Sequence, residues 1–319
     1  MENNRPLVYL DHNILSAFTK GQGSEILNLL RDESQVVYST ATLKEIMQSK
    51  GYEKAFLKTL VDLNANYMEL QLDENFRIID KIRQYSADPN VVFEQHKISN
   101  SFTDPSMFIQ KLFGGMQERS FSDIIDEEWK ATLERLDQAV APIKEFTFLL
   151  EQMKSHGGKI NSDLKSTLQK AIPQQINFNP VSVLRTQIEQ GPDSLNNLQG
   201  ARVIERIWAI LSKKPGMPDS FEALCGQGSP EIMAAMNPNN TLYLKVVSMH
   251  AVLQMLGYWP DKNCNKSDRF NSFIQDQYHT ANAIFTTAFI TLDKRLAMKA
   301  RAIYEYLGVS TKVILFQSS

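Results

Sequence analysis

Four acidic residues stand close to apolar segments at the two ends of the sequence: Asp11, Glu45, Asp276 and Asp293. Carboxylate oxygens are the ligands that Mg²⁺ and Mn²⁺ prefer, whereas several carboxylates packed together without a cation repel one another. A site that holds one or two such ions can activate a water molecule and stabilise the leaving oxygen of a phosphodiester. The four acids are therefore candidate ligands of a hydrolytic metal site. The sequence has no Gly-rich phosphate loop, so nucleotide hydrolysis of the P-loop kind is not supported.

Each acid also has a simpler explanation when it is considered alone. An Asp directly after a strand is most often a turn former or a helix cap, which fits Asp11 and Asp293. Glu45 and Asp276 each fit an ordinary exposed helix residue, and Asp268 is an alternative to Asp276 eight residues earlier. The metal-site hypothesis therefore depends on all four acids reaching the same place.

The N-terminal acids lie in an alternation of strand and helix. The apolar runs 7–10 and 36–38 are typical of strands that are buried on both faces. A helix is expected from Ser24, between the two runs, and another after the second run, capped by Thr40 or Thr42. This order favours a parallel sheet with helices packed against it.

The same alternation returns at the C-terminal end of the sequence. Its expected elements are a helix over 270–285, a strand over 288–292, a helix over 294–306 and a strand over 312–316. In an open parallel sheet, ligands bind beyond the carboxyl ends of the strands. Asp11, Glu45 and Asp293 would then lie at one edge of the sheet, which is the arrangement that a shared metal ion requires.

The middle of the sequence predicts helices only. Apolar residues recur there at helical spacing, and turn signals such as Gly157–Gly158 separate the runs. We therefore expect a discontinuous α/β domain over 1–51 and 266–319, with an all-helical insertion over 52–265. Two sequential domains are the alternative, but they would leave two short strands at each end without a common sheet.

Four stretches of this sequence resemble the motifs of PIN-domain nucleases: Val8–Asn13, Thr42–Ile46, Asp276–Ala281 and Phe289–Leu296. The resemblance covers less than a third of the chain. It implies a PIN-like parallel sheet and an active, metal-dependent nuclease whose ions are held by the four acids. It also implies RNA as a more frequent substrate than DNA. PIN domains are usually about half this length, so the insertion is a departure that leaves the substrate open.

Five further residues are candidates for supporting or substrate-binding roles: Asn13, His279, Thr291, Lys294 and Arg295. Asn13 fits either a hydrogen bond to a water on the metal or a cap of the next helix. His279 shares a helix face with Asp276, where it would orient a carboxylate, contact substrate phosphate or simply pack. A Thr two residues before the last acid is common in the family that the sequence resembles.

Lys294 and Arg295 belong to a basic cluster that continues with Lys299 and Arg301. This cluster fits either a surface that holds substrate phosphates or an ordinary solvated helix face. By contrast, residues 118–151 carry nine acidic and four basic side chains, so that part of the insertion is an unlikely surface for nucleic acid. It could instead bind a protein partner.

Composition limits these interpretations. The chain carries 34 Lys and Arg against 36 Asp and Glu, so any nucleic acid must be held by a local patch, by metal ions or through another protein. Its two cysteines form neither a disulfide framework nor a zinc-type pair, which indicates a reducing, cytoplasmic location. No apolar run approaches the roughly 18 residues of a spanning helix, so we expect no membrane association.

The four acids together with the resemblance to PIN-domain nucleases imply a Mg²⁺- or Mn²⁺-dependent endonuclease, and the resemblance implies RNA as the substrate in preference to DNA. The main alternative is a non-catalytic PIN-like scaffold whose helical insertion binds a protein partner. An aspartyl-phosphate phosphatase is a weaker alternative, because that class usually has a second Asp two residues after the first, where this sequence has Asn13.

Overall fold

The structure of the chain is a computed structural model that describes residues 5–99, 107–140, 147–171, 173–189, 191, 194–227 and 237–316. The chain divides into two compact units. The sheet unit comprises 1–103, 185–261 and 272–319, and the helical unit comprises 104–184 and 262–271.

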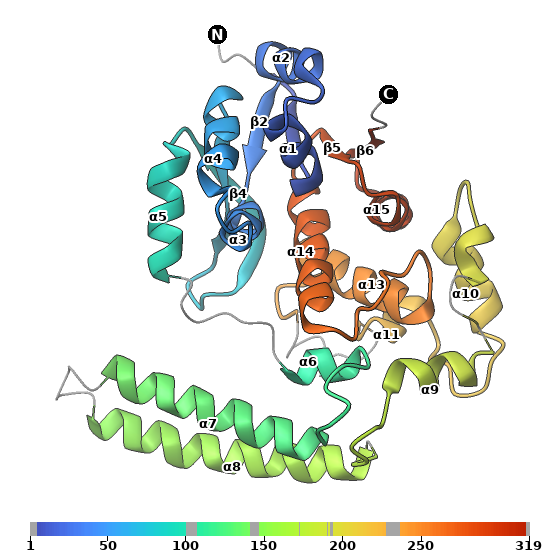
Figure 1. Cartoon of the computed structure of the whole chain (residues 1–319). Coiled ribbons are helices and arrows are strands. Elements are labelled where there is room, and N and C mark those ends of the chain that lie inside the picture. The colour runs from blue at the N-terminus through green and yellow to red at the C-terminus, as the bar shows by residue number, and fades with distance from the viewer. Residues whose placement is uncertain are drawn as a thin grey trace. The chain divides into compact units, whose positions relative to one another are not determined.

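A six-stranded sheet forms the centre of the sheet unit (Figure 1), in the order β4-β3-β2-β1-β5-β6. Its strands are β1 (Leu7–Leu10), β2 (Gln35–Tyr38), β3 (Asn66–Leu72), β4 (Ile78–Tyr85), β5 (Ala288–Thr291) and β6 (Lys312–Leu315). All neighbouring strands are parallel except β3 and β4, which are antiparallel. The predicted α/β class is confirmed, and all four predicted strands are present.

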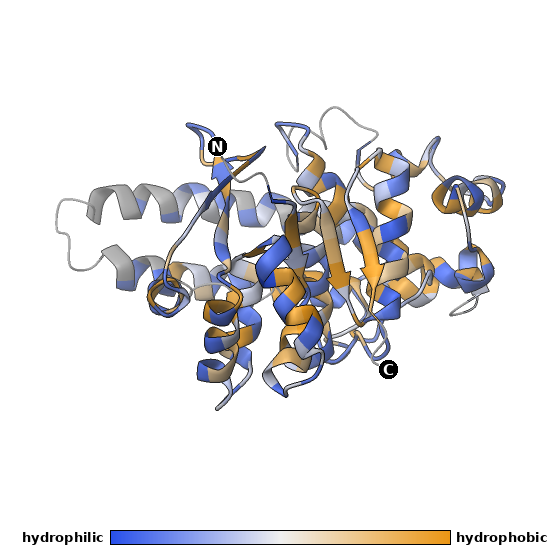
Figure 2. Cartoon of the chain, turned by 90° about the horizontal axis from the view of Figure 1, so that it is seen from above, coloured by the Kyte–Doolittle hydropathy of each residue, from blue (hydrophilic) through white to orange (hydrophobic). Residues whose placement is uncertain are grey.

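The helices of the sheet unit are α1 (His12–Thr19), α2 (Ser24–Glu33), α3 (Thr40–Gln48), α4 (Glu53–Asp62), α5 (Pro89–Ser99), α10 (Val203–Leu211), α11 (Phe221–Leu224), α13 (Leu242–Leu256), α15 (Lys294–Leu307) and the larger part of α14 (Ser267–Ala283). A short 3₁₀ helix, η2, spans Ser194–Asn197, and α9 (Pro180–Gln187) crosses the boundary between the units. In Figure 2 the strands in the middle of the sheet and the helix faces packed on them are largely apolar.

The two faces of β1 pack against different helices, because successive side chains of a strand point to opposite sides of the sheet. Val8 and Leu10 belong to a core that includes residues of α1 to α5. On the opposite face, the fully buried Tyr9 lies against Phe289 of β5 and His279 of α14. Asp11, two residues after Tyr9, directly follows the strand.

The segment 52–265 is not all helical, contrary to the sequence-based prediction. It contains the hairpin β3–β4, which extends the sheet at the edge beyond β2. In addition, α4, α5, α10, α11 and α13 belong to the sheet unit, which is therefore larger than the two terminal segments predicted for the α/β domain. The hairpin was missed because its outer strand is mostly exposed and shows little apolar alternation.

The hairpin also fixes the start of α13. The Asp80 carboxylate of β4 accepts hydrogen bonds from the backbone N–H groups of Leu242 and Tyr243, at 2.6 and 3.1 Å. These N–H groups belong to the first turn of the helix, where no carbonyl of the same helix can accept them. A negative charge at this end also interacts favourably with the helix dipole.

The helical unit contains α6 (Met107–Leu112), α7 (Phe121–Val140) and α8 (Thr147–Ala171), and α7 packs against α8. The predicted turn at Gly157–Gly158 is wrong, because both residues lie inside α8. A Cβ atom at Gly157 would come within 1.9 Å of the Trp129 ring, so the glycine provides space for this ring.

No helix in the described part of the chain combines the length and apolar character needed to span a membrane.

We expect Asp80→Ala to lower the free energy of unfolding by about 1 to 2 kcal/mol, because two backbone donors at the start of α13 lose their charged acceptor. Urea unfolding measures the change. Lys81→Ala on the same strand is the matched control and should stay within about 0.5 kcal/mol of the wild type. Equal stabilities for Asp80→Ala and the control would contradict the proposed link between hairpin and helix.

Candidate metal centre

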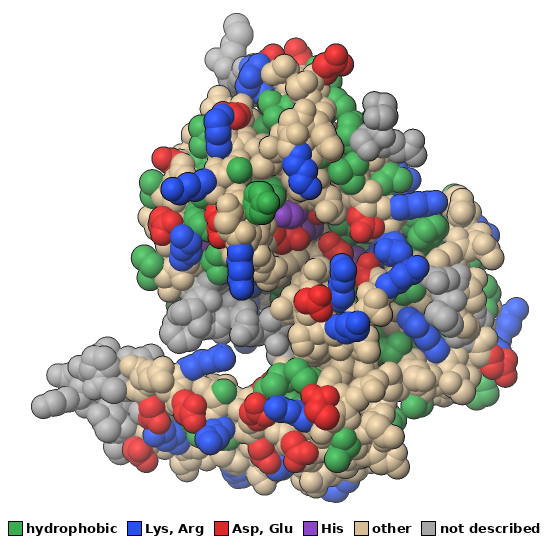
Figure 3. All heavy atoms as spheres, in the orientation of Figure 1, with side chains coloured by type: hydrophobic (Ala, Val, Ile, Leu, Met, Phe, Trp, Pro, Cys, Tyr) green, Lys and Arg blue, Asp and Glu red, His purple; other side chains and the backbone are tan. Residues whose placement is uncertain are grey.

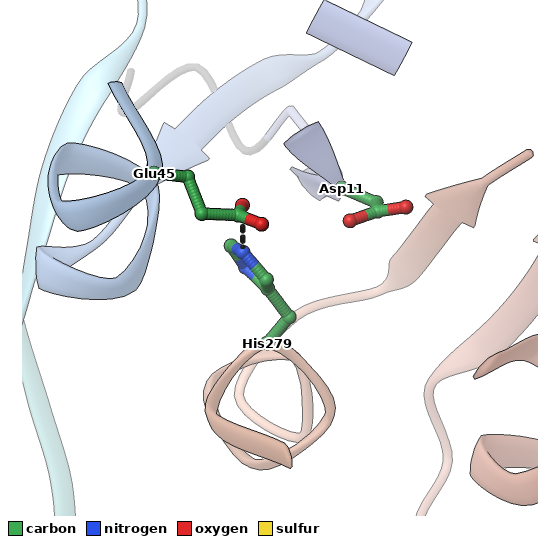
Figure 4. Close-up of side chains that lie close together, drawn as sticks. All are labelled: Asp11, Glu45 and His279. Carbon is green, nitrogen blue, oxygen red and sulfur yellow. Dashed lines mark hydrogen bonds and ion pairs between the residues drawn. The ribbon is translucent and has the colours of Figure 1, made fainter. Parts of the chain in front are cut away.

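The strand order reverses at β1, because the chain proceeds from β1 to β2 on one side while β5 and β6 lie on the other. Such a reversal leaves a crevice at the carboxyl ends of the strands, which is where open α/β sheets bind ligands. Asp11, Glu45 and His279 meet there, each with one ligand atom within 4.8 Å of the others. Figure 4 shows them approaching from the end of β1, from α3 and from α14.

Asp11 is at the N-cap position of α1, yet its side chain makes no capping hydrogen bond. Its Oδ2 atom instead accepts hydrogen bonds from Thr291 Oγ1 at 2.7 Å and from Asn13 Nδ2 at 3.0 Å. The residue is 1% exposed, and this burial, together with the nearby Glu45 charge, raises the pKa of Asp11 to about 6. The nearby His279 and the two hydrogen bonds act in the opposite direction. Because the Asp11 side chain makes no capping hydrogen bond, the helix-cap explanation of this residue is excluded.

His279 connects the Glu45 carboxylate to the sheet. Its Nε2 atom lies 2.5 Å from Glu45 Oε2, and its Nδ1 atom lies 2.8 Å from the Tyr9 hydroxyl. The Tyr9 hydroxyl in turn lies 2.6 Å from the hydroxyl of Ser39, which caps α3. Since the histidine is completely buried, this chain of hydrogen bonds fixes its ring relative to both β1 and α3.

The charge state of His279 follows from its neighbours. Burial alone would lower its pKa, but the contact with Tyr9 and the charges of Glu45 and Asp11 raise the pKa of His279 well above its usual value. The ring is then an imidazolium that donates from both nitrogens and neutralises part of the carboxylate charge. A protonated imidazole cannot bind a metal through Nε2, so His279 orients Glu45 in this state.

Asp276 lies on the same helix, one turn before His279, and is partly buried. Burial and the charges of Asp261, Asp11 and Glu45 raise its pKa well above the usual value, while Lys299 acts in the opposite direction. Asp276 is therefore close enough to the other carboxylates to interact with them electrostatically. It is not among the three residues whose ligand atoms lie within 4.8 Å of one another.

Lys299 is completely buried and donates a 2.6 Å hydrogen bond to Asp261 Oδ2. This placement corrects the prediction that Lys299 belongs to an exposed basic cluster, since its position on α15 faces the interior. Asp261 is held on its other side by Gln254, whose side-chain amide bonds both its backbone N–H and its carbonyl. The two members of the pair act on Asp276 in opposite directions: the charge of Asp261 raises the pKa of Asp276, and the smaller effect of Lys299 lowers it.

Asp293 serves as the N-cap of α15. Its Oδ1 atom accepts hydrogen bonds from the backbone N–H groups of Arg295 and Leu296, at 2.6 and 3.1 Å. Asp293 is not among the three residues whose ligand atoms lie within 4.8 Å of one another. Asp293 does line an open depression of about 320 Å³ together with Asn13 and Lys20.

The predicted supporting residues divide into two groups. Thr291 and Asn13 hold Asp11, so Asn13 contacts the acid itself instead of capping α1. Lys294 lies over the Trp259 ring at 4.8 Å, and the Arg295 backbone receives the Asp293 cap. On the face shown in Figure 3, acidic side chains and a histidine gather near the middle of the sheet unit.

Sequence reasoning missed three residues around the site: Tyr9, Asp261 and Lys299. Tyr9 had a signal, because it stands two residues before Asp11 and therefore points to the same side of the sheet. Asp261 and Lys299 gave none, since a loop acid and a helical lysine are ordinary features of any sequence. Their importance depends on the pairing that the folded chain creates.

No protein-family model, curated protein or solved structure matches the chain. The resemblance to PIN-domain nucleases therefore stays a prediction. The site is nonetheless suitable for a hard divalent cation, because a carboxylate oxygen of Asp11 and one of Glu45 lie within 4.8 Å of each other. Asp11 and Asp276 both have raised pKa values. A cation that neutralised these two acids would therefore stabilise the folded protein.

We expect Asp11→Asn to stabilise the metal-free protein by about 1 to 3 kcal/mol at pH 8, because Asn keeps the hydrogen-bond acceptor and removes a buried charge. The folded-state pKa of Asp11 is raised from 3.8 to about 6, so its unfavourable contribution appears as the pH rises through that window. The gain should therefore nearly vanish at pH 4. Urea unfolding in EDTA at both pH values measures it.

The exposed Asp32 provides the control for this experiment, since Asp32→Asn removes a surface charge of the same kind and should leave stability almost unchanged. A destabilised Asp11→Asn protein at pH 8 would contradict the inference that this carboxylate is under electrostatic strain.

Two substitutions of Asp293 separate the effect of its capping hydrogen bonds from the effect of its charge. Asp293→Ala should lower the free energy of unfolding by about 0.5 to 2 kcal/mol, because α15 loses its cap, whereas Asp293→Asn should retain most of the stability. Thermal unfolding of both variants tests this. Equal losses for Ala and Asn would show that the charge of Asp293, and not its capping hydrogen bonds, stabilises the helix.

Proposed function

We propose that the chain is a PIN-like, Mg²⁺- or Mn²⁺-dependent nuclease that hydrolyses phosphodiester bonds, with RNA favoured over DNA. The observation that supports this proposal best is the convergence of Asp11 and Glu45 at the carboxyl end of β1, where the strand order reverses. The α/β sheet with helices on both faces also agrees with the resemblance on which the prediction was based. The cytoplasmic location and a protein partner for the helical unit stay predictions.

Asp11 and Glu45 would hold the cation, with Asp276 contributing from α14. When bound, the ion would lower the pKa of a water molecule and stabilise negative charge on the phosphate. The carboxylate of Asp11 suits this task, because Thr291 and Asn13 both donate to Oδ2 and leave Oδ1 to other partners. The same two hydrogen bonds fix the rotamer of the acid before any ligand arrives.

His279 is the positioning residue for Glu45. Its Nε2–H group donates to Glu45, while Tyr9 holds the opposite side of the ring. As an imidazolium, it also reduces the repulsion between the carboxylates in the metal-free protein. Removal of a cation by a chelator should therefore leave the site folded, with His279 as the remaining positive charge between the acids.

The substrate would approach over the depression beside Asp11. Asn13, Ser16, Lys20 and Asp293 line this depression, which has a volume of about 320 Å³. Lys20 provides a positive charge there, whereas the charge of Asp293 is partly used in the cap of α15. A local positive charge of this kind can hold phosphate even though the whole chain carries a net charge of −2.

Cleavage of a fluorescently labelled single-stranded RNA, with single-stranded DNA alongside, tests the proposal. We expect cleavage in millimolar Mn²⁺ or Mg²⁺, none in EDTA, and a loss of at least about 100-fold for Asp11→Asn and Glu45→Gln, because each variant removes a ligand charge. Asp32→Asn is the control at an exposed acid and should cleave normally.

Metal binding is measured separately by thermal unfolding with and without Mn²⁺. We expect the wild type to gain stability and Asp11→Asn to gain none. Full activity of Asp11→Asn would overturn the proposed mechanism. Absence of both cleavage and metal stabilisation in the wild type would instead favour the non-catalytic scaffold.

A further inference from the structure

A second concave site lies close to the carboxylates in the sheet unit. It is a pocket of about 130 Å³ whose lining comes from α3, α13 and α14: Thr40, Ala41, Lys44, Tyr243, Tyr278 and Asn282. Two of these residues are chain neighbours of the site already described, since Lys44 precedes Glu45 and Tyr278 precedes His279. The pocket therefore shares the helices α3 and α14 with the carboxylate group.

The pocket offers donors and a positive charge. Lys44 Nζ lies 5.9 Å from the centre of the Tyr278 ring, and Thr40 is the first residue of α3, a nine-residue helix. The first turn of a helix carries backbone N–H groups and the positive end of the dipole, which favour an anion. None of the six described lining residues is acidic. The chemistry of this pocket is thus opposite in sign to that of the carboxylate group.

Tyr243 provides an independent indication that a ligand belongs in the pocket. Its side chain lines the pocket while only 5% of the residue is exposed, and no hydrogen bond of its hydroxyl is found in the described part of the chain. The hydroxyl is not among the fully buried atoms without a partner, so it faces the pocket, where a ligand that accepts a hydrogen bond would pair with it. The residue is nevertheless held in place, because its backbone N–H donates to Asp80.

Burial raises the pKa values of Tyr243 and Tyr278, so both phenols stay protonated and can donate hydrogen bonds. A phosphate group has acceptor oxygens and negative charge, and Lys44, Thr40 and the two phenols offer complementary groups. The small volume and the enclosure by three helices suit a group at the end of a chain better than a strand that passes through.

We propose that the pocket lined by Thr40, Lys44, Tyr243 and Tyr278 binds a terminal phosphate of the nucleic acid and thereby sets the distance between that end and the bond cleaved beside Asp11. This inference rests on the proposed nuclease function for the identity of the ligand. The phosphate chemistry of the pocket stands on the lining residues alone.

Binding of labelled single-stranded RNA in EDTA tests the inference without any cleavage. Three oligonucleotides of one sequence carry a 5′-phosphate, a 3′-phosphate or neither. We expect the wild type to bind one phosphorylated form roughly tenfold more tightly than the unphosphorylated one, as one or two charge-assisted hydrogen bonds would provide. Lys44→Gln should abolish this preference, and Tyr243→Phe, which removes only the hydroxyl, should reduce it.

The control is Lys54→Gln, which removes the same charge from an exposed position of α4 and should keep the preference. Thermal unfolding verifies that each variant folds, and Thr40→Val replaces Lys44→Gln if the latter is unfolded. An equal preference in Lys44→Gln, Tyr243→Phe and the wild type would overturn the assignment. So would equal wild-type affinity for all three oligonucleotides.

Inorganic phosphate distinguishes a nucleic-acid terminus from free phosphate. Millimolar phosphate should remove the preference and leave the affinity for the unphosphorylated oligonucleotide unchanged. Stabilisation of the wild type by phosphate, lost in Lys44→Gln but without any oligonucleotide preference, would overturn the nucleic-acid assignment.

The two proposals fail in different ways. A preference that requires Lys44, in a protein that cleaves nothing with any metal, would support the pocket and overturn the nuclease. Cleavage by the wild type with the same KM in Lys44→Gln, together with no preference in EDTA, would support the nuclease and overturn the pocket.

Discussion

The pairing of β1 with β2 on one side and β5 on the other is the interaction on which the rest of the structure depends. It places Asp11 at the reversal of strand order and brings Thr291 to within hydrogen-bond distance of its carboxylate. It also buries Tyr9 against Phe289, which leaves the Tyr9 hydroxyl directed at His279. Without β5, the acid would lose Thr291, one of its two hydrogen-bond donors.

Burial of several acids at this place requires compensation, and the chain provides it in two forms. Near Glu45 the positive charge is that of His279, held by Tyr9. Near Asp276 it is that of Lys299, although the charge of its partner Asp261 acts on Asp276 more strongly in the opposite direction. Both cations are fully buried, so they interact with the carboxylates in a medium that screens charge weakly. The site is thus preorganised by charges that come from helices on one side of the sheet.

The sequence predicted those parts of the site whose place in the fold follows directly from a local sequence pattern. Apolar runs specify β1 and β5, and an acid that directly follows β1 must lie at the sheet edge. The same rule could not separate Asp11 from Asp293, because a helix cap and a candidate ligand occupy the same position after a strand. Only the hydrogen bonds show that Asp293 caps its helix and Asp11 does not. The hairpin β3–β4 and the Lys299–Asp261 pair were not predictable, since an exposed edge strand and a long-range ion pair leave no periodic signal.

The position of β1 in the sheet also affects how the protein is made. The backbone N–H of Asp11 donates to the carbonyl of Ile290, a residue synthesised almost 280 positions later. A nascent chain therefore exposes one hydrogen-bonding edge of β1 until β5 has been synthesised and has left the ribosome. Closure of that long loop is entropically costly and slows folding. The order of synthesis itself thus keeps Asp11 and Glu45 apart from His279 and Thr291 until α14 and β5 have been made.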